Sequence, residues 1–179
     1  MKRWLLIVGG IIIGLFLVTY VVGIFLPRDH VAAMSIDLNK DPGTVWSMIS
    51  DFGGTTKWRK DVSSVRMDPP VDGKVRFTET GGQGDIQFEV ISQQPLFRQS
   101  VRIVDDNQPF GGVWTWQLER MLDGPAPKTR LTITEAGFIK SPIFRTMGKL
   151  FFSPTDTIEG YLTALARALG ENASPQHVR

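Results

Sequence analysis

Glu79 and Glu135 are the residues of this sequence best suited to acid–base chemistry. Each continues the phase of inward apolar residues along an expected strand, Glu79 two residues after Phe77 and Glu135 two residues after Ile133. Residues two apart share one face of a strand, so both carboxyl groups are predicted on the apolar side. The alternative is that the strand ends splay into solvent and that both residues are ordinary surface acids.

A carboxyl group inside a protein must be paired or protonated, and both states suit a pocket better than a dry core. Arg98 or Arg102 on a neighbouring strand is the expected partner. The two histidines, His30 close behind the leader and His177 near the end, lie outside any metal-ligand spacing and are not expected in the interior. The sequence therefore predicts no metal site and no cofactor, and catalysis would depend on the two glutamates.

Aromatic residues are the second group with a possible role in a site. Alternation places Trp114 and Trp116 on the face of their strand that also carries Leu118. Packing in the core is the ordinary interpretation, and the alternative is that these rings line a pocket and stack on a flat or apolar ligand. The residues proposed to bind such a ligand are Trp58, Phe77, Phe88, Trp114, Trp116, Glu135, Phe138 and Tyr161.

Phe138 fits this group only with a local irregularity in its strand. It is out of phase with Leu131 and Ile133, so a bulge near Gly137 is required to turn its ring inward.

Charge and composition exclude several function classes. The chain has 20 basic and 18 acidic residues, and Lys2 and Arg3 precede the apolar leader, which leaves 18 of each sign in the remainder. Because the basic residues are scattered, we expect no nucleic-acid binding. The chain has no cysteine, which excludes disulfides, thiolate nucleophiles and cysteine-ligated metals.

The first 27 residues are predicted to be a membrane anchor. Residues 4–26 carry no charge and span roughly 35 Å as a helix, enough to cross a bilayer core of about 30 Å. A cleaved signal peptide is the alternative, although its apolar core is shorter. Lys2 and Arg3 favour an inside N-terminus and an exported domain over a cytoplasmic one, and Gly10 with Gly14 matches a pattern for helix dimerisation.

The remaining residues predict one domain, 28–170, and a patternless tail, 171–179. A strand at 30–38 is followed by a helix that starts at Asp41-Pro42 and ends at Gly53-Gly54, and then by a short irregular segment or single turn. Turn signals at 8–12-residue spacing predict hairpins and an antiparallel sheet. The six later strands are expected at 62–67, 74–80, from Ile86 to before Pro95, 97–104, 113–121 and 130–138, with turns at 105–107 and 123–128.

An apolar helical lead-in at 142–152 precedes the last helix, Ser153–Gly170. Ser153 is its expected cap, Pro154 occupies its first turn and Gly170 ends it. Its apolar stripe needs a large partner, which predicts a sheet curled around it and an α+β fold. The stripe consists of Ile158, Tyr161, Leu162, Leu165 and Leu169.

The stretch Pro42-x-x-Val45-Trp46-x-x-Ile49-Ser50-Asp51-Phe52, followed by Lys57-Trp58-Arg59, resembles the opening of the START-like, or SRPBCC, superfamily. The most similar branch is the one named polyketide cyclase/dehydrase and lipid transport. The resemblance covers roughly residues 30–170. It implies a helix-grip fold, in which a seven-stranded antiparallel sheet wraps the last helix around a hydrophobic cavity.

Three functions fit these observations. The first is the binding of a hydrophobic small molecule or lipid by a membrane-tethered domain. The second is an enzyme of the cyclase or dehydratase kind with Glu79 or Glu135 as its acid or base. The third is a membrane-anchored interaction module whose interior is filled and whose outer surface carries an apolar patch.

Overall fold

The computed structural model describes residues 2–104, 108–122, 126–151 and 153–178. The predicted turn at 105–107 and the first half of the turn at 123–128 lie outside these residues. The elements are α1 (Lys2–Phe25), β1 (Asp29–Leu38), α2 (Pro42–Ser50), η1 (Phe52–Lys57), β2 (Val62–Val71), β3 (Lys74–Gly81), β4 (Gly84–Gln94), β5 (Arg98–Ile103), β6 (Phe110–Met121), β7 (Lys128–Ile139), α3 (Pro142–Phe151), α4 (Asp156–Ala168) and β8 (Gln176–His177).

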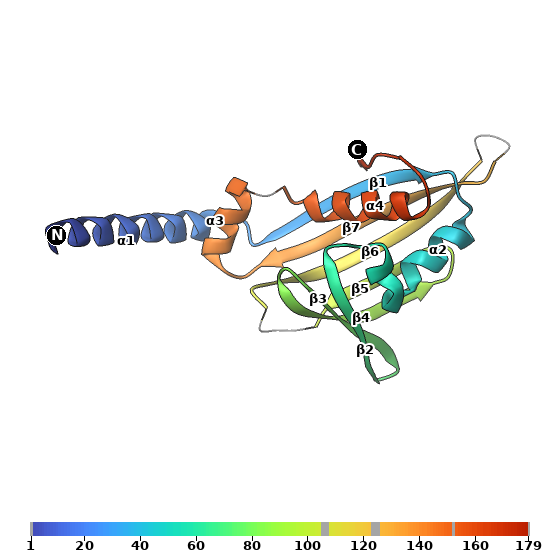
Figure 1. The fold of residues 1–179 in the computed structure, drawn as a ribbon, viewed down its shortest axis with the longest axis horizontal. Helices are drawn as coiled ribbons and strands as arrows, with labels where there is room; N and C mark the ends of the chain where they lie inside the picture. Colours follow the sequence, from blue (N-terminus) through green and yellow to red (C-terminus); the bar gives the residue numbers. More distant parts are fainter. Residues whose placement is uncertain (1, 105–107, 123–125, 152, 179) are drawn as a thin grey trace.

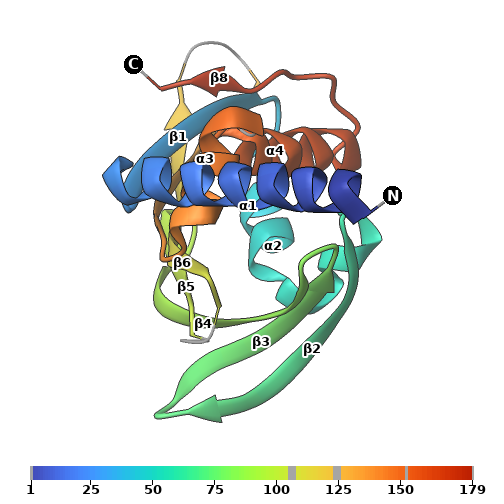
Figure 2. The same ribbon diagram turned by 90° about the vertical axis from the view of Figure 1, so that its left-hand side faces the viewer.

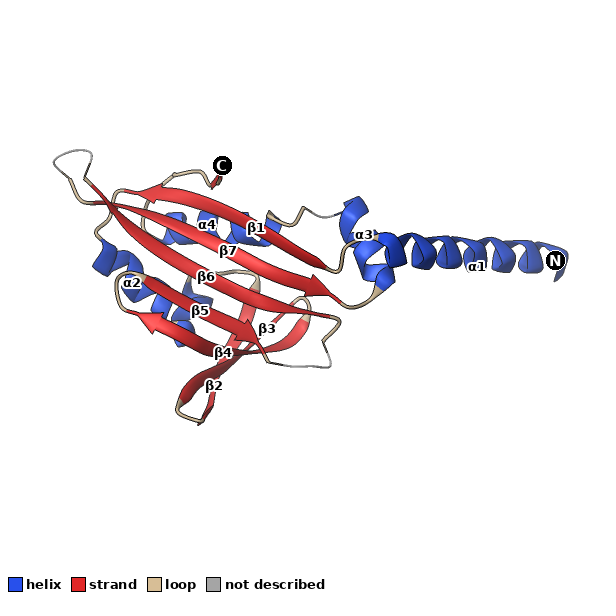
Figure 3. Ribbon diagram, turned by 180° about the vertical axis from the view of Figure 1, so that it is seen from behind, coloured by secondary structure: helices blue, strands red, loops and turns tan. Residues whose placement is uncertain are grey.

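The strands form one curled antiparallel sheet that wraps the last helix, as the sequence predicts. Its order is β2-β3-β4-β5-β6-β7-β1-β8, so consecutive hairpins build most of it and β1 closes beside β7. The sheet has eight strands rather than seven. In the segment expected to be a patternless tail, Gln176 and His177 pair with Ser35 and Met34 of β1. Figure 3 shows the outer face of the sheet, with α2 and α4 behind it.

Helix α4 lies across the concave face of the sheet (Figure 1) and buries its apolar stripe there. Ile158, Leu162 and Leu165 are fully buried, and Tyr161 is 8% exposed. The helix begins at Asp156 rather than Ser153. The Ser153 hydroxyl bonds to the hydroxyl of Thr155 and accepts its N–H at 3.4 Å, in the turn that precedes the helix. It ends as predicted, with Gly170 at φ 77°, a left-handed conformation that favours glycine.

Helix α2 has the predicted start and an earlier end. Asp41 caps it by accepting a hydrogen bond from the Thr44 N–H at 3.0 Å, with Pro42 in the first turn. The helix stops at Ser50, before the glycines, because the Asp51 side chain accepts the Gly54 N–H at 3.0 Å and starts the short 3-10 helix η1. The predicted single turn after α2 is therefore this second helix.

Strand β2 continues four residues beyond its predicted end at Met67 and includes both prolines, Pro69 and Pro70. Prolines are tolerated there because β2 is the edge of the sheet and needs hydrogen bonds on one side only. The hairpin to β3 turns at Asp72 and Gly73, whose φ values of 51° and 74° fit the two-residue turn that matches strand twist.

Helix α1 projects from one end of the domain, with the N-terminus at its far end (Figure 1). Its segment Leu6–Phe25 has a mean hydropathy of 2.6 and is long and apolar enough to cross a membrane. This composition fits both a membrane anchor and a signal sequence. The final turns of α1 pack against α3, and Figure 2 shows α1 crossing in front of α3 and α4.

Candidate functional site

The concave face of the sheet carries a group of four large rings that we call the aromatic cluster: Trp58, Trp114, Trp116 and Tyr161. Trp114 and Trp116 project from β6, Tyr161 from α4, and Trp58 follows η1. The Tyr161 ring centroid lies 5.1 Å from Trp58, 6.0 Å from Trp114 and 5.8 Å from Trp116. These distances are those of direct ring contact. The cluster therefore occupies the space between sheet and helix where the cavity was expected.

Phe77 and Phe88, also predicted ligand contacts, form a separate stack with Phe52. The Phe77 centroid lies 4.4 Å from that of Phe52 and 5.2 Å from that of Phe88, with nearly parallel rings. Phe77 is 3% exposed. The stack packs the end of α2 and η1 onto β3 and β4, which is a core function.

Glu79 lies inside, as its phase predicts, but its partner is Arg59. The Arg59 Nη1 donates to both carboxylate oxygens of Glu79 at 3.1 Å, and its Nη2 lies 2.6 Å from Asp61 Oδ2. The guanidinium also lies 5.4 Å from the centre of the Tyr161 ring. This ion pair therefore lies directly beside the aromatic cluster.

The predicted partners, Arg98 and Arg102, are wrong because strand alternation directs them to the opposite face from Val101. Arg102 instead binds Glu89 at 2.8 Å on the outer face. Arg59 follows a short helix and not a strand, so no periodicity in the sequence pointed to it.

Burial governs the protonation of the polar groups around the cluster. It raises the pKa of the Glu79 carboxyl, and the charge of Arg59 opposes that shift. Burial likewise raises the pKa of the Tyr161 phenol, which therefore stays protonated and able to donate a hydrogen bond.

Glu135 also lies on the concave face, next to a histidine that the sequence analysis placed outside the interior. His30 Nε2 lies 3.4 Å from Glu135 Oε1, and the two side chains are 28% and 21% exposed. Burial raises the pKa of Glu135, while His30 and the Trp114 indole oppose the shift. A carboxyl and an imidazole at this distance can share a proton.

His30 was missed because it directly follows the apolar leader. The available signal was its strand phase. His30 lies two residues before Ala32 and therefore shares the inward face of β1 with Ala32, Met34 and Ile36. A glycine opposite it makes room for the ring, because a Cβ on Gly137 would overlap the imidazole.

Phe138 does not join the aromatic cluster. The ladders of β7 with β1 and with β6 run through Gly137 without a register shift, so the predicted bulge is absent from this described stretch. Phe138 therefore keeps its place on the outer face. Its ring lies between the Arg28 guanidinium, 5.1 Å from the centroid, and the Lys140 ammonium, 5.9 Å from it.

One donor in the aromatic cluster lacks a hydrogen-bond partner. Among the described residues, Trp116 Nε1 and Glu171 Oε1 are the buried side-chain polar atoms with none. Glu171 is partly satisfied, since its other oxygen accepts from the backbone and side chain of Asn39 at 3.0 and 3.2 Å. The Trp116 indole has a single N–H; it interacts with the Tyr161 phenol and lowers the pKa of that group, but the contact does not have the geometry of a hydrogen bond.

A hollow of about 380 Å³ lies at the other end of α4, away from α1, and Trp58 is the member of the aromatic cluster that lines it. It is lined by Ser47, Met48, Asp51, Gly54, Lys57, Trp58 and Ala168. Within the described part of the chain, no group of three histidine, aspartate or glutamate side chains is placed to hold a metal ion.

Comparison with known proteins assigns the fold to a family. A family model described as polyketide cyclase / dehydrase and lipid transport matches residues 29–170. The chain belongs to this family. A search of curated proteins gave no match.

Solved structures with the same fold include three from bacteria. The Zhui aromatase/cyclase from Streptomyces sp. R1128 has a TM-score of 0.64 at 12% identity, covering 79% of this chain and 94% of its own. A conserved protein from Geobacillus kaustophilus has a TM-score of 0.60 at 16% identity, covering 83% and 100%. A START superfamily protein from Mycobacterium smegmatis has a TM-score of 0.59 at 16% identity, covering 79% and 97%. At these identities the likeness concerns the fold alone.

Proposed function

We propose that this family member binds an apolar molecule, a lipid or a flat ring compound, at the aromatic cluster, and that α1 anchors the binding domain to a membrane. The observation that carries the proposal is the unpartnered indole N–H of Trp116 among apolar rings. A buried donor without a partner costs about 1–3 kcal/mol, which a ligand with an acceptor oxygen would recover.

The chemistry of the cluster narrows the ligand. Its walls are aromatic, and its donors are the Trp116 indole, the Tyr161 phenol and the Arg59 guanidinium, the last already paired with the Glu79 carboxylate. A ligand that suits these groups has an apolar body and a carbonyl, carboxylate or quinone oxygen at one end. Because the Tyr161 ring touches the other three rings, such a ligand must separate them, and Trp58 is the ring next to an existing hollow.

Mass spectrometry tests the binding proposal directly. The full chain is purified in detergent, extracted with organic solvent and compared with Trp116→Phe, which keeps an aromatic ring and removes the N–H. We expect a co-purifying apolar compound in the wild type, and a reduction of about tenfold in Trp116→Phe if one hydrogen bond is lost. A wild-type chain that is empty and takes up no fatty acid or quinone from solution would refute the proposal.

A cyclase- or dehydratase-like reaction is the second candidate, and the pairing of His30 with Glu135 at 3.4 Å favours it. Glu135, with its raised pKa, would give a proton to a carbonyl oxygen of a bound ligand, and His30 would stabilise the carboxylate that remains. Turnover lost in Glu135→Gln and His30→Asn with ligand binding retained supports this candidate. Turnover that survives in both variants excludes it.

The membrane anchor and its orientation are part of the first proposal. The apolar segment Leu6–Phe25 supports the anchor, and the positive charges of Lys2 and Arg3 support an inside N-terminus with the domain exported. Protease added to intact cells should then digest the domain. Gly10 and Gly14 lie on an uncovered stretch of α1 and remain candidates for a helix dimer.

A further inference from the structure

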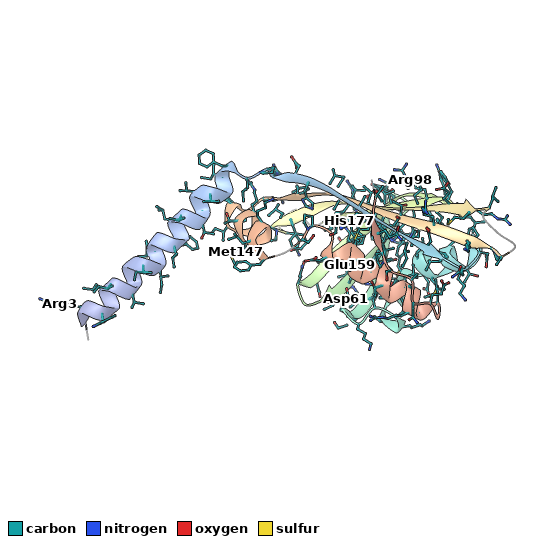
Figure 4. All side chains as sticks on the ribbon, turned by 90° about the horizontal axis from the view of Figure 1, so that it is seen from above. Arg3, Asp61, Arg98, Met147, Glu159 and His177 are labelled. Atoms are coloured by element: carbon teal, nitrogen blue, oxygen red, sulfur yellow. The ribbon has the colours of Figure 1, made fainter. Side chains whose placement is uncertain are left out.

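Helix α3 has an apolar face that the domain leaves uncovered. Four large apolar residues on one side of this helix are exposed: Phe144 by 54%, Met147 by 40%, Leu150 by 67% and Phe151 by 66%. Their spacing of three and four residues puts them on one continuous arc. Figure 4 shows Met147 on the side of α3 that is turned away from the domain. A patch of this kind on a folded domain marks a contact with a partner or a membrane.

The opposite side of α3 is bound to the last turns of α1. The Thr146 hydroxyl, which is buried, donates to the Thr19 carbonyl at 2.8 Å. The Arg145 Nη1 reaches the carbonyls of Gly23 and Leu26 at 3.3 and 3.4 Å, which are free acceptors at a helix C-terminus.

The same guanidinium is fixed to the domain and holds the two helices together. Its Nε and Nη2 donate to the carbonyls of Ile139 and Lys140, both at 2.8 Å. The helices approach so closely that a Cβ on Gly23 would overlap the Pro142 carbonyl. The position of α3 along α1 is therefore defined.

These contacts set the depth of α3 relative to a membrane crossed by Leu6–Phe25. Thr19 lies six residues before Phe25, which is about 9 Å along a helix. Helices that lie in a membrane interface bury their apolar faces by about 5–10 Å. The exposed arc of α3 would thus reach the acyl chains of the leaflet from which α1 emerges.

The charged residues around this end of the domain lie where lipid headgroups would be. Arg28 lies three residues after the end of α1 and Lys140 two residues before α3, on either side of the Phe138 ring. Lys149 is exposed on the side of α3 opposite Met147 and Phe151. An aromatic ring with basic neighbours suits the level of the headgroups, and the positive charges favour anionic lipids.

We infer that α3 is a second membrane-contact element, whose face Phe144, Met147, Leu150 and Phe151 inserts into the leaflet beside α1. This inference rests on the proposed membrane anchor. Its partner is the surface of a lipid bilayer, preferably an anionic one. The choice follows from continuity with the apolar surface of α1 and from the basic residues at the junction. The His30–Glu135 end of the concave face would then open towards this leaflet.

Spin-label depth measurements on the full chain test the inference, since the natural chain has no cysteine to remove. The single variants Phe144→Cys and Met147→Cys are labelled and reconstituted in vesicles of phosphatidylcholine and phosphatidylglycerol. Lys149→Cys on the opposite side of the same helix and Glu159→Cys on α4 are matched controls, and Ile12→Cys reports on α1. Accessibility to oxygen is compared with accessibility to a water-soluble nickel chelate.

We expect labels at 144 and 147 to show a several-fold higher ratio of oxygen to nickel accessibility than labels at 149 and 159. A label at 147 exposed to water while the label at 12 is in the bilayer would overturn the inference and leave the anchor intact. Water exposure at 12 as well would overturn both. Strong spin–spin broadening at 147 without oxygen accessibility would show that a second copy covers α3, and would also overturn it.

Discussion

Replacing Arg59 by methionine tests whether the Arg59–Glu79 pair is a buried electrostatic unit. The two side chains are 13% and 15% exposed, and the arginine contributes two hydrogen bonds of 3.1 Å to the carboxylate. Methionine keeps much of the apolar stem of the side chain and removes the charge. The substitution therefore leaves the Glu79 carboxyl inside the domain without its cation.

The expected loss of stability depends on pH, and its sign follows from the pKa of Glu79. Burial raises that pKa above its ordinary value of 4.5, and removing Arg59 raises it further. Between 4.5 and the raised value, the unfolded chain has lost the proton and the folded chain has kept it, so stability falls as pH rises. The slope in that window is at most about 1.4 kcal/mol per pH unit.

Arg59→Met should therefore cost about 1 kcal/mol near pH 5 and about 3 kcal/mol at pH 7, the lower end of the range for breaking a buried pair. The measurement is urea unfolding of the full chain in detergent micelles, followed by tryptophan fluorescence at several pH values. The double variant Arg59→Met/Glu79→Gln should lose the extra pH dependence.

Arg130→Met is the matched control, because the Arg130–Asp37 pair is 43% and 42% exposed. Its cost should stay below about 1 kcal/mol without added slope above pH 5. An equal loss at pH 5 and pH 7 in Arg59→Met would refute the electrostatic explanation and leave lost packing as the cause.

Three further predictions concern other parts of the domain. Trp116→Phe should change the free energy of unfolding, measured in urea, by less than about 1 kcal/mol. The smaller ring loses packing contacts, but the substitution also removes an unpaired buried donor. A loss above about 3 kcal/mol would mean that the indole N–H has a hydrogen-bond partner. Gly170→Ala should lower stability by about 1–2 kcal/mol in thermal unfolding, since φ is 77° there, and an unchanged melting temperature would contradict the assigned helix end. Hydrogen bonds from Thr78, Arg66 and Gln87 lower the pKa of Asp68 from 3.8 to about 2, so the stability that this carboxylate contributes is present above pH 3.8 and lost as pH falls towards 2. Asp68→Asn should therefore reduce the dependence of stability on pH between 3.8 and about 2. An acid-unfolding profile identical to that of the wild type would contradict this prediction.

The fold was accessible from the sequence because its signals are repeated and local. Alternation along the strands, the stripe of α4 and Gly170 each specify part of the sheet and helix independently. The predictions that were wrong concerned features that depend on single contacts. Ser153 was expected to cap α4, but its hydroxyl bonds to Thr155, and a two-residue strand at 176–177 is too short to show any period.

The site was only half accessible for the same reason. Strand phase correctly put Trp114, Trp116 and the two glutamates on the concave face, because alternation fixes the side of a sheet. Strand phase could not identify the partner of Glu79, since Arg59 lies after a short helix. It also could not predict the ring contacts of Tyr161, which depend on the distance between α4 and the sheet. The prediction that Phe138 faces the pocket was wrong because it assumed a bulge near Gly137, whereas strand alternation alone places the ring on the outer face.

The connection between α1 and the domain limits how far the domain can travel. Three residues, 26–28, separate Phe25 from Asp29, so even fully extended they span about 10 Å. With Arg145 holding the last turn of α1, the domain has little freedom to swing away from a bilayer that α1 crosses. With the proposed anchor in place, the domain would not carry a ligand from one membrane to another. Its cargo would have to be picked up and released at one spot on the same surface, and any longer journey would require a separate, diffusible carrier.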